Sequence, residues 1–262
     1  ERAYILQNDD GRIVFAIPYE HDYTLIGTTD LDYEGDPGAA AITAGEVDYL
    51  CAAVNRYFSR QVAPGDVVAS YAGVRPLFDD GATEARAATR EYVLDYDEAD
   101  GLAPLLSVYG GKITTYRRLA EEALTRLAGR FPTMSGAWTR HVPLPGGNFA
   151  ADGFEAEVAR LRAACPVIEA RHARRLVRAY GTRAMLIVDG VTGDADWGER
   201  FGADLTEREV NYLMANEWAR TAEDVLWRRS KLWLRLSRKD IARLQAWMAE
   251  VRRTAQAPVA LK

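Results

Sequence analysis

The pattern of apolar and polar positions divides the chain into a β-rich first half and a helical second half. Short apolar or β-branched runs that stop at turn residues predict strands. Asp10–Gly11 between the first two runs indicates a hairpin. The predicted strands are residues 3–7, 12–17, 23–30, 67–77, 90–95 and 105–108.

Helical periodicity and capping residues predict the helices. Thr43 and Glu46 form a capping-box pattern for a helix that runs to about Phe58. A second helical face begins at Ile113 and continues to Leu127. In the second half we predict five helices. The first begins near Asp152, and the second covers Glu169 to Tyr180 and stops at Gly181. The third follows the Thr206–Glu209 capping pattern, the fourth covers 221–229, and the last begins at Ser237.

An irregular connector separates these halves, because prolines and a Gly-Gly pair cluster between Phe131 and Gly147. The pattern therefore predicts an α+β chain of two domains. Residues 1–135 form a partial, β-rich α/β domain, and residues 136–262 form an all-α C-terminal domain.

Composition is typical of an ordinary folded protein, with 262 residues, 48% hydrophobic and 27% charged residues. No apolar run approaches the roughly 20 residues needed to span a bilayer. The two cysteines, Cys51 and Cys165, do not form a disulfide framework, so a reducing, cytoplasmic setting fits best. The chain starts at Glu1 and enters a predicted strand almost at once, which suggests a piece of a longer protein.

The net charge of −5 hides an asymmetry. Residues 218–253 contain ten Lys or Arg against four acidic residues, which gives +6, and the remainder carries −11. This segment also holds Trp218, Trp227, Trp233 and Trp247. Two interpretations stay open: a surface that docks on an anionic membrane or partner, or a helical core with a solvated basic face. No nucleic-acid-binding motif is present.

The stretch 105–117 combines a predicted buried strand, a Gly110–Gly111 turn and a helix start. A glycine pair lets backbone approach a ligand closely. The helix start offers free N–H groups, to which Lys112 adds a charge and Thr114 and Thr115 add hydroxyls. The pattern favours an anion or an electron-rich ring edge, although an ordinary strand–helix turn has the same appearance. Its spacing excludes a P-loop.

Two arginines are candidates for the same site. Arg75 lies in Gly73-Val-Arg-Pro76, where glycine and proline fix the turn, and Arg90 precedes the next predicted strand. Guanidinium groups suit forked recognition of phosphate or carboxylate. We expect both to converge with Lys112 at strand ends, although each alone could be an ion-paired surface residue.

Together these motifs resemble the D-amino-acid-oxidase superfamily of FAD enzymes and, within it, the FAD-dependent glycerol-3-phosphate dehydrogenases. The resemblance covers essentially the whole chain, in the family's order. The family's N-terminal Gly-x-Gly-x-x-Gly unit does not occur here, so the chain is similar to the C-terminal half. The similar segments are 12–18, 26–30, 70–77, 88–90, 107–117, 144–147 and 216–229.

The resemblance implies oxidation of sn-glycerol 3-phosphate to dihydroxyacetone phosphate, with hydride passing to FAD and electrons to a quinone. It implies a substrate-domain part, the last strand and helix of the FAD domain, and the helical domain. No metal is expected, and none of the three histidines, His21, His141 and His172, matches a family base. The implied residues are catalytic Arg75, Arg90 and Lys112, substrate-binding Arg75, Arg90 and Thr115, and cofactor-binding Gly110, Gly111, Lys112, Ile113 and Thr114.

It also implies a peripheral location on the inner face of the cell membrane and admits a homodimer. Two alternatives remain open: an oxidase of the same superfamily that acts on glycerophosphate or an amine, and a non-enzymatic helical docking module. We expect the 262-residue chain alone to be inactive, because the strand and helix around Gly110–Gly111 are typical of packing against a parallel sheet.

Overall fold

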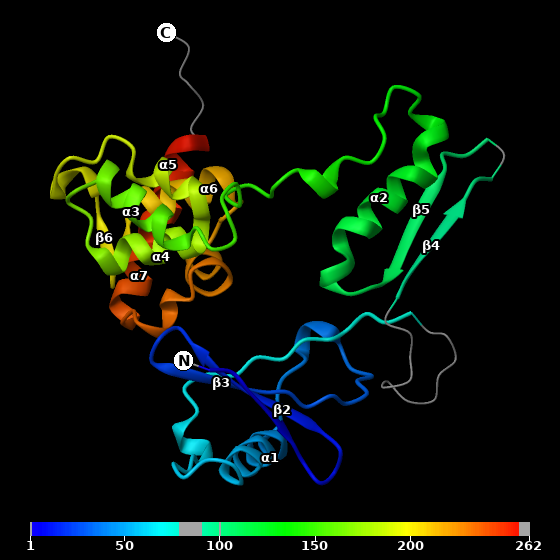
Figure 1. Cartoon of the computed structure of the whole chain (residues 1–262), viewed down its shortest axis with the longest axis horizontal. Helices are drawn as coiled ribbons and strands as arrows, with labels where there is room; N and C mark the ends of the chain where they lie inside the picture. Colours follow the sequence, from blue (N-terminus) through cyan, green and yellow to red (C-terminus); the bar gives the residue numbers. More distant parts are fainter. Residues whose placement is uncertain (1, 79–90, 100, 257–262) are drawn as a thin grey trace. The chain divides into compact units, whose positions relative to one another are not determined.

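The computed structural model describes residues 2–78, 91–99 and 101–256. The chain forms two compact units, residues 1–140 and residues 141–262. Strands concentrate in the first unit and helices in the second, which confirms the α+β class (Figure 1).

The first unit begins with an antiparallel meander of three strands, in the order β1–β2–β3. Gly11, with φ +78°, lies in the turn between β1 and β2, so the predicted hairpin is confirmed. Leu6 and Val14 face each other across the pair and are buried, while their neighbours Ile5 and Ile13 are exposed. This alternation is the period of a sheet with one covered face. The strands are β1 (Tyr4–Gln7), β2 (Ile13–Tyr19) and β3 (Tyr23–Gly27).

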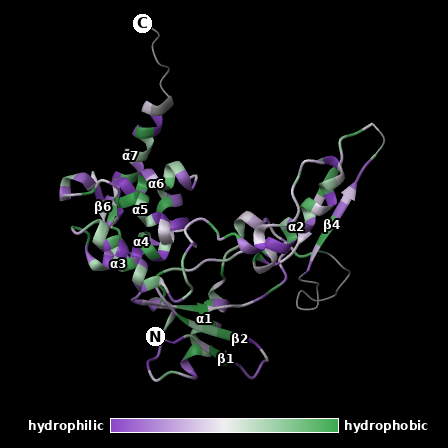
Figure 2. Ribbon diagram, turned by 45° about the horizontal axis from the view of Figure 1, so that its top comes forward, coloured by the Kyte–Doolittle hydropathy of each residue, from purple (hydrophilic) through white to green (hydrophobic). Residues whose placement is uncertain are grey.

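Helix α1 (Ala44–Asn55) packs on this meander. The predicted capping box is present: the Thr43 hydroxyl accepts from the Glu46 N–H at 3.2 Å, and the Glu46 carboxylate accepts from the Thr43 N–H at 2.9 Å. The hydrophobic stripes of β2 and α1 are visible in Figure 2. Together with Leu6 of β1 they form a small core of Leu6, Val14, Leu50, Ala53 and Val54.

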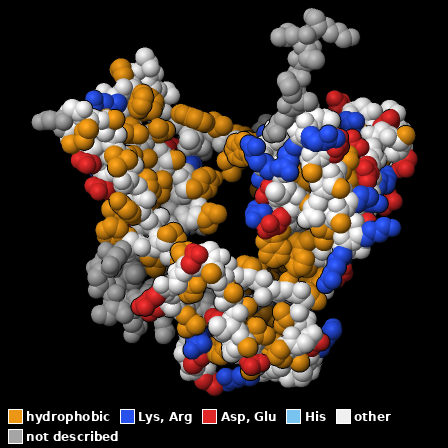
Figure 3. Space-filling model, turned by 180° about the vertical axis from the view of Figure 1, so that it is seen from behind, with side chains coloured by type: hydrophobic (Ala, Val, Ile, Leu, Met, Phe, Trp, Pro, Cys, Tyr) orange, Lys and Arg blue, Asp and Glu red, His pale blue; other side chains and the backbone are white. Residues whose placement is uncertain are grey.

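The remaining elements of the first unit are a hairpin and a helix. Strands β4 (Tyr92–Asp97) and β5 (Leu105–Gly110) pair antiparallel, and α2 (Tyr116–Leu127) follows. The expectation of a buried β5 strand is wrong, because Leu105 is 61% exposed and, among the described strands, β4 alone pairs with β5. None of the described residues between 55 and 140 is buried. Figure 3 shows hydrophobic side chains over this part of the surface.

The predicted strand at residues 67–77 is absent, and this segment is irregular. Val67 and Val68 are exposed, and none of the described strands pairs with them. A β-branched run becomes a strand only where a neighbour accepts its backbone hydrogen bonds, so propensity alone did not decide the conformation.

The second unit consists mainly of helices around one large core. Gly181 follows α4 with φ +54°, as a helix stop requires, and the Ser237 hydroxyl accepts from the Asp240 N–H at 3.2 Å to start α7. Every helix of the unit contributes buried side chains to this core. The helices are α3 (Phe154–Ala164), α4 (Ala170–Tyr180), α5 (Ala184–Val188), α6 (Glu207–Asn216) and α7 (Arg238–Gln256).

Three features of this unit differ from expectation. Helix α5 was not predicted, nor was the ribbon of β6 (Arg200–Gly202) and β7 (Leu205–Thr206), because such short elements show no period. The predicted helix at 221–229 is π-helical over Asp224–Arg229, and the Ser230 N–H donates to the Val225 carbonyl at 3.0 Å. The connector between Phe131 and Gly147 is irregular, as predicted, apart from a short 3-10 turn.

Candidate functional site

The turn at the end of β5 has backbone that favours glycine. Gly110 and Gly111 have φ values of +66° and +88°. A Cβ on Gly110 would lie 3.1 Å from the Glu91 carbonyl oxygen and 3.3 Å from the Phe78 nitrogen. A Cβ on Gly111 would lie 3.1 Å from the Tyr92 Cβ. The pair therefore meets both requirements of the sequence argument, a tight turn and close backbone approach.

The residues after this turn start a helix. A 3-10 turn at Ile113–Thr115 leads into α2, and Thr115 donates both its N–H (2.9 Å) and its hydroxyl (2.8 Å) to the Lys112 carbonyl. The first N–H groups of a helix have no partner within the helix, so those of Ile113 and Thr114 suit an electron-rich acceptor. Lys112, Ile113 and Thr114 are exposed, Ile113 by 89%.

Arg75 lies at the predicted turn, where the Leu77 N–H donates to the Arg75 carbonyl at 2.9 Å. Its guanidinium makes an ion pair with Asp30 at 3.0 Å, and both side chains are about half exposed. A pair of this kind contributes at most about 1 kcal/mol, so the guanidinium can exchange Asp30 for another anion at small cost.

The segment that carries Arg75 reaches the glycine turn. Three residues after Arg75, the Phe78 backbone lies against Gly110, and the Phe78 ring contacts Tyr109 with centroids 6.0 Å apart. Arg90, the other predicted arginine, lies outside the described residues. The described part of the chain has no cluster of His, Cys, Asp or Glu that could hold a metal ion.

A buried charged cluster in the second unit was missed by the sequence argument. Glu209 accepts two hydrogen bonds from Arg175, at 2.7 and 2.6 Å, and one from the Tyr180 hydroxyl at 2.6 Å. Arg175 Nε also lies 2.7 Å from Asp204 Oδ1, an ion pair without hydrogen-bond geometry. Glu209 is fully buried. The predicted Thr206 capping box is therefore wrong, because Glu209 turns inward and the Thr206 side chain makes no capping bond.

The electrostatics of this cluster follow from burial and pairing. Burial opposes ionisation of Glu209, but Arg175 and Tyr180 outweigh it and hold its pKa below the ordinary value. Burial and the adjacent Glu209 raise the pKa of Tyr180 well above its usual range. Burial, with Arg175 second, lowers the pKa of His172, whose ring lies 5.1 Å from that of Trp197. Its Nε2 atom has no hydrogen-bond partner among the described residues.

The tryptophans of the basic segment divide between core and surface. Trp247 packs against the core with its ring 5.3 Å from Phe201, and Trp233 packs there as well, with its ring 4.7 Å from Trp227. Trp218 is 81% exposed. Of the described helices, none has the length and apolar character needed to cross a membrane.

A known protein family matches each half of the chain. Residues 1–117 match the FAD dependent oxidoreductase family, and residues 137–257 match the C-terminal domain of alpha-glycerophosphate oxidase. The chain therefore belongs to the family of FAD-dependent oxidoreductases.

Three similar proteins are named as dehydrogenases of polyol phosphates. A glycerol-3-phosphate dehydrogenase of Pseudomonas aeruginosa is 50% identical, over 95% of this chain and 48% of its own length. The D-erythritol 1-phosphate dehydrogenase of Brucella abortus is 47% identical, over 94% and 49%. The aerobic glycerol-3-phosphate dehydrogenase of Escherichia coli is 43% identical, over 95% and 50%. The chain spans about half the length of these curated relatives.

A solved structure of a glycerol-3-phosphate dehydrogenase is also similar to this chain. The glycerol-3-phosphate dehydrogenase of Bacillus halodurans, complexed with FAD, superimposes with a TM-score of 0.73 at 27% identity. The match covers 96% of this chain and 49% of that one.

Proposed function

We propose that this chain supplies the substrate-holding and flavin-facing part of an FAD-dependent dehydrogenase that oxidises sn-glycerol 3-phosphate to dihydroxyacetone phosphate. The observation that carries the proposal is the Gly110–Gly111–Lys112 turn, whose positive φ angles and close backbone contacts favour glycine and whose next N–H groups begin a helix. The names of the relatives support the reaction and the substrate class.

The turn has features that fit FAD. Close backbone approach at Gly111 and the N–H groups of Ile113 and Thr114 suit the N1/C2=O edge of a flavin ring, where negative charge develops on reduction. FAD supplies the hydride acceptor. Lys112 would add a positive charge at this edge and so would favour negative charge on the bound ring. Lys112→Met should therefore lower the flavin midpoint potential and slow reduction; a raised KM at unchanged potential would assign Lys112 to the substrate instead.

Arg75 and Arg90 hold the substrate phosphate in this proposal, and Thr115 contributes at the substrate side of the turn. The exposed Arg75–Asp30 pair suits such a role, because a doubly charged phosphate competes well with one carboxylate. The proton of the C2 hydroxyl passes to a base that we do not assign to this chain.

A second substrate is favoured by one specific finding. D-Erythritol 1-phosphate is named for a relative only slightly less similar than the first. Both compounds are polyol phosphates, so the phosphate contact at Arg75 serves either. The ratio of kcat/KM for glycerol 3-phosphate and D-erythritol 1-phosphate decides between them.

The electron acceptor and the location are further parts of the proposal. We propose a quinone as acceptor, on an enzyme bound peripherally to the inner face of the cell membrane. The exposed Trp218 in a basic segment supports membrane docking. The family description of residues 137–257 names an oxidase, so oxygen is the competing acceptor. Reduction of a soluble quinone without hydrogen peroxide formation supports the proposal, and stoichiometric peroxide contradicts it.

Membrane docking has its own test. Binding to vesicles that contain anionic lipid should fall steeply as salt rises past the physiological range, since exposed charges are screened within about 8 Å. Trp218→Ala should weaken this binding, whereas Trp247→Phe, a change at a core position, should leave it unchanged. Binding that ignores salt contradicts the docking role.

The 262-residue chain by itself should neither retain FAD nor oxidise substrate. Several apolar side chains of β5 and α2 are exposed, Leu105, Val108, Tyr116 and Leu124 among them, and need another surface. In the isolated chain a second copy would supply it, which sedimentation at two concentrations detects.

A chimera tests the proposed function. The part of the Pseudomonas aeruginosa relative that precedes its matched half is fused to this chain, and the 262-residue chain alone is the control. We expect the chimera to be yellow and to reduce dye with glycerol 3-phosphate, and the control to be colourless and inactive. A yellow, active control would show that the cofactor site is misplaced. A folded, FAD-bound chimera without activity would contradict the assigned substrate.

A further inference from the structure

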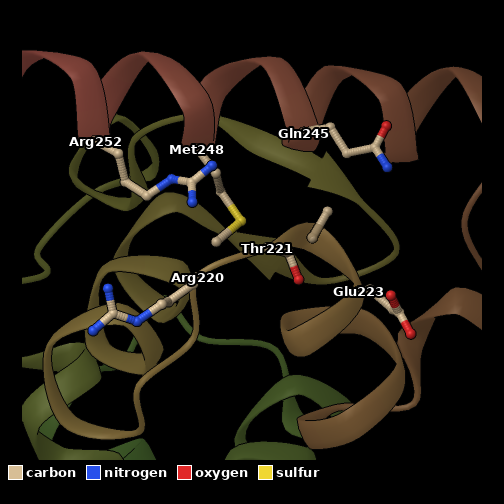
Figure 4. A pocket seen from close by; sticks show the side chains of 7 residues that line it. Arg220, Thr221, Glu223, Gln245, Met248 and Arg252 are labelled. Carbon is tan, nitrogen blue, oxygen red and sulfur yellow. The ribbon is translucent and has the colours of Figure 1, made fainter. Parts of the chain in front are cut away.

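A pocket of about 300 Å³ lies within the second unit, between α7 and the turn that begins the π-helical segment. Three residues of α7, spaced for one helix face, form one wall, and a tetrapeptide forms the other (Figure 4). This volume is at the lower end for small-molecule sites. The lining residues are Arg220, Thr221, Ala222, Glu223, Gln245, Met248 and Arg252.

Two arginines approach this pocket from opposite walls. Figure 4 shows the Arg252 side chain running from α7 to beside Met248, on the wall opposite the turn that carries Arg220. Among the described residues, neither guanidinium has an ion pair or a hydrogen bond to a side chain. Other arginines nearby are paired: Arg228 with Glu223 and Asp224, and Arg253 with Glu250. Two guanidinium groups without an ion pair among the described residues thus lie at the pocket.

The nearest carboxylates are already occupied. Glu223 accepts from Arg228 at 2.9 Å. Asp224 accepts from the N–H groups of Arg220 and Thr221 and from the Thr221 hydroxyl, each at 2.9 Å. These bonds, more than offsetting burial, lower the pKa of Asp224 to about 2. The carboxylates beside the pocket therefore already have hydrogen-bond and ion-pair partners. The guanidinium groups of Arg220 and Arg252 are free to bind a ligand.

The pocket offers one apolar wall besides these charges. Met248 is buried and belongs to the core, so the wall it forms is apolar. Gln245, on the same helix face, adds an amide that can donate. Forked guanidinium donors beside an amide match the oxygens of a phosphate group better than a single carboxylate.

We propose that this pocket binds a phosphate group, held between Arg220 and Arg252 and flanked by Gln245. A soluble phosphate and a phosphate monoester lipid headgroup present the same chemistry. The proposal does not depend on the oxidation of glycerol 3-phosphate.

Methionine-methyl NMR tests this proposal at a single site. The chain has four methionines, and of these Met248 lines the pocket. The full 262-residue chain is labelled at the methionine methyl groups, with Met248→Leu for assignment. An Arg75→Gln background removes the phosphate contact proposed for the first unit. Inorganic phosphate at pH 8 is titrated, and soluble short-chain phosphatidic acid forms the second arm, with phosphatidylcholine of equal chain length as its control.

We expect the Met248 signal to shift with saturation while the other three stay in place. Arg220→Gln and Arg252→Gln should each weaken binding about tenfold or more, since each removes charge-assisted bonds. Arg253→Gln is the matched control: it removes the same charge from the next residue of α7, whose partner is Glu250, and should leave binding unchanged.

A shift with inorganic phosphate identifies a soluble phosphate, and a shift with phosphatidic acid alone identifies a headgroup; both support the pocket. The proposal is overturned if neither probe moves Met248. It is also overturned if Arg253→Gln weakens binding as much as the pocket variants, because net charge would then explain the effect.

Discussion

The two units of this chain differ most in what they bury. The second unit surrounds one core to which every helix from α3 to α7 contributes. The first unit has a small cluster between its meander and α1, and its β4–β5 hairpin and α2 have no buried residue at all. The second unit can therefore stabilise itself, whereas the part of the first unit with the candidate flavin turn needs an apolar partner surface.

The charged pair at Arg75 and the charged cluster at Glu209 show the same contrast. The Arg75–Asp30 pair in the first unit is about half exposed, whereas Glu209 in the second unit is fully buried with Arg175 and Tyr180. An exposed arginine can change partners at little cost, but a buried ion pair is fixed once the fold forms. Changes at Arg75 should thus alter binding, and changes in the Glu209 cluster should alter stability.

The largest effect should come from Glu209→Ala, which leaves Arg175 buried without its main partner. We expect a loss of about 3–5 kcal/mol in the free energy of unfolding of the second unit. Urea unfolding followed by tryptophan fluorescence measures it, since five of the six tryptophans lie in this unit. Glu250→Ala, at an exposed pair with Arg253, is the control and should cost about 1 kcal/mol or less.

A double variant sharpens this result. Arg175→Met combined with Glu209→Leu removes both charges and fills the space with apolar groups, so it should recover most of the loss. If the double variant is as unstable as Glu209→Ala, packing rather than unpaired charge explains the cost.

The next effect concerns binding in the first unit. Arg75→Ala in the chimera should lower kcat/KM for glycerol 3-phosphate about ten- to a hundredfold, because a charge-assisted contact is worth about 1.5–3 kcal/mol. Oxidation of unphosphorylated glycerol should be unchanged. Arg56→Ala, which breaks another exposed Arg–Asp pair of this unit, should affect neither substrate. If Arg75→Ala lowered kcat/KM equally for glycerol 3-phosphate and glycerol, Arg75 would not bind the phosphate.

The smallest effect is a pH dependence in the second unit. Because the pKa of His172 lies below its ordinary value of 6.5, the unfolded chain takes up a proton first as pH falls, and stability is lost below about pH 6.5. The slope for one such group is at most about 1.4 kcal/mol per pH unit. His172→Phe keeps a ring against Trp197. In this variant the urea midpoint of unfolding should change less between pH 7.5 and pH 5 than it does in the unchanged chain. An unchanged profile would contradict the role of His172.

Local signals predicted the parts of the fold that local interactions determine. The Asp10–Gly11 hairpin, the Thr43 capping box, the Gly181 stop and the Gly110–Gly111 turn depend on neighbouring backbone, and all are confirmed. They also located the candidate site, because a strand, a glycine pair and a helix start are adjacent in the chain.

The failures arise where distant residues decide. The run at 67–77 has strand propensity but no paired neighbour among the described strands. Glu209 fits a capping pattern with Thr206, yet Arg175, 34 residues away, binds it instead. The one available sequence signal was Arg175 and His172 on the apolar face of α4, where a charged side chain requires a buried partner.

Hydrogen–deuterium exchange of the 262-residue chain tests the contrast between the units most directly. Amides of α4 and α6 should open only near the free energy of unfolding of the second unit, while those of β5 and α2 should exchange with opening free energies near zero. Two protein concentrations control for self-association. Protection of β5 and α2 equal to that of α4, independent of concentration, would contradict the claim that this part of the first unit lacks its own core.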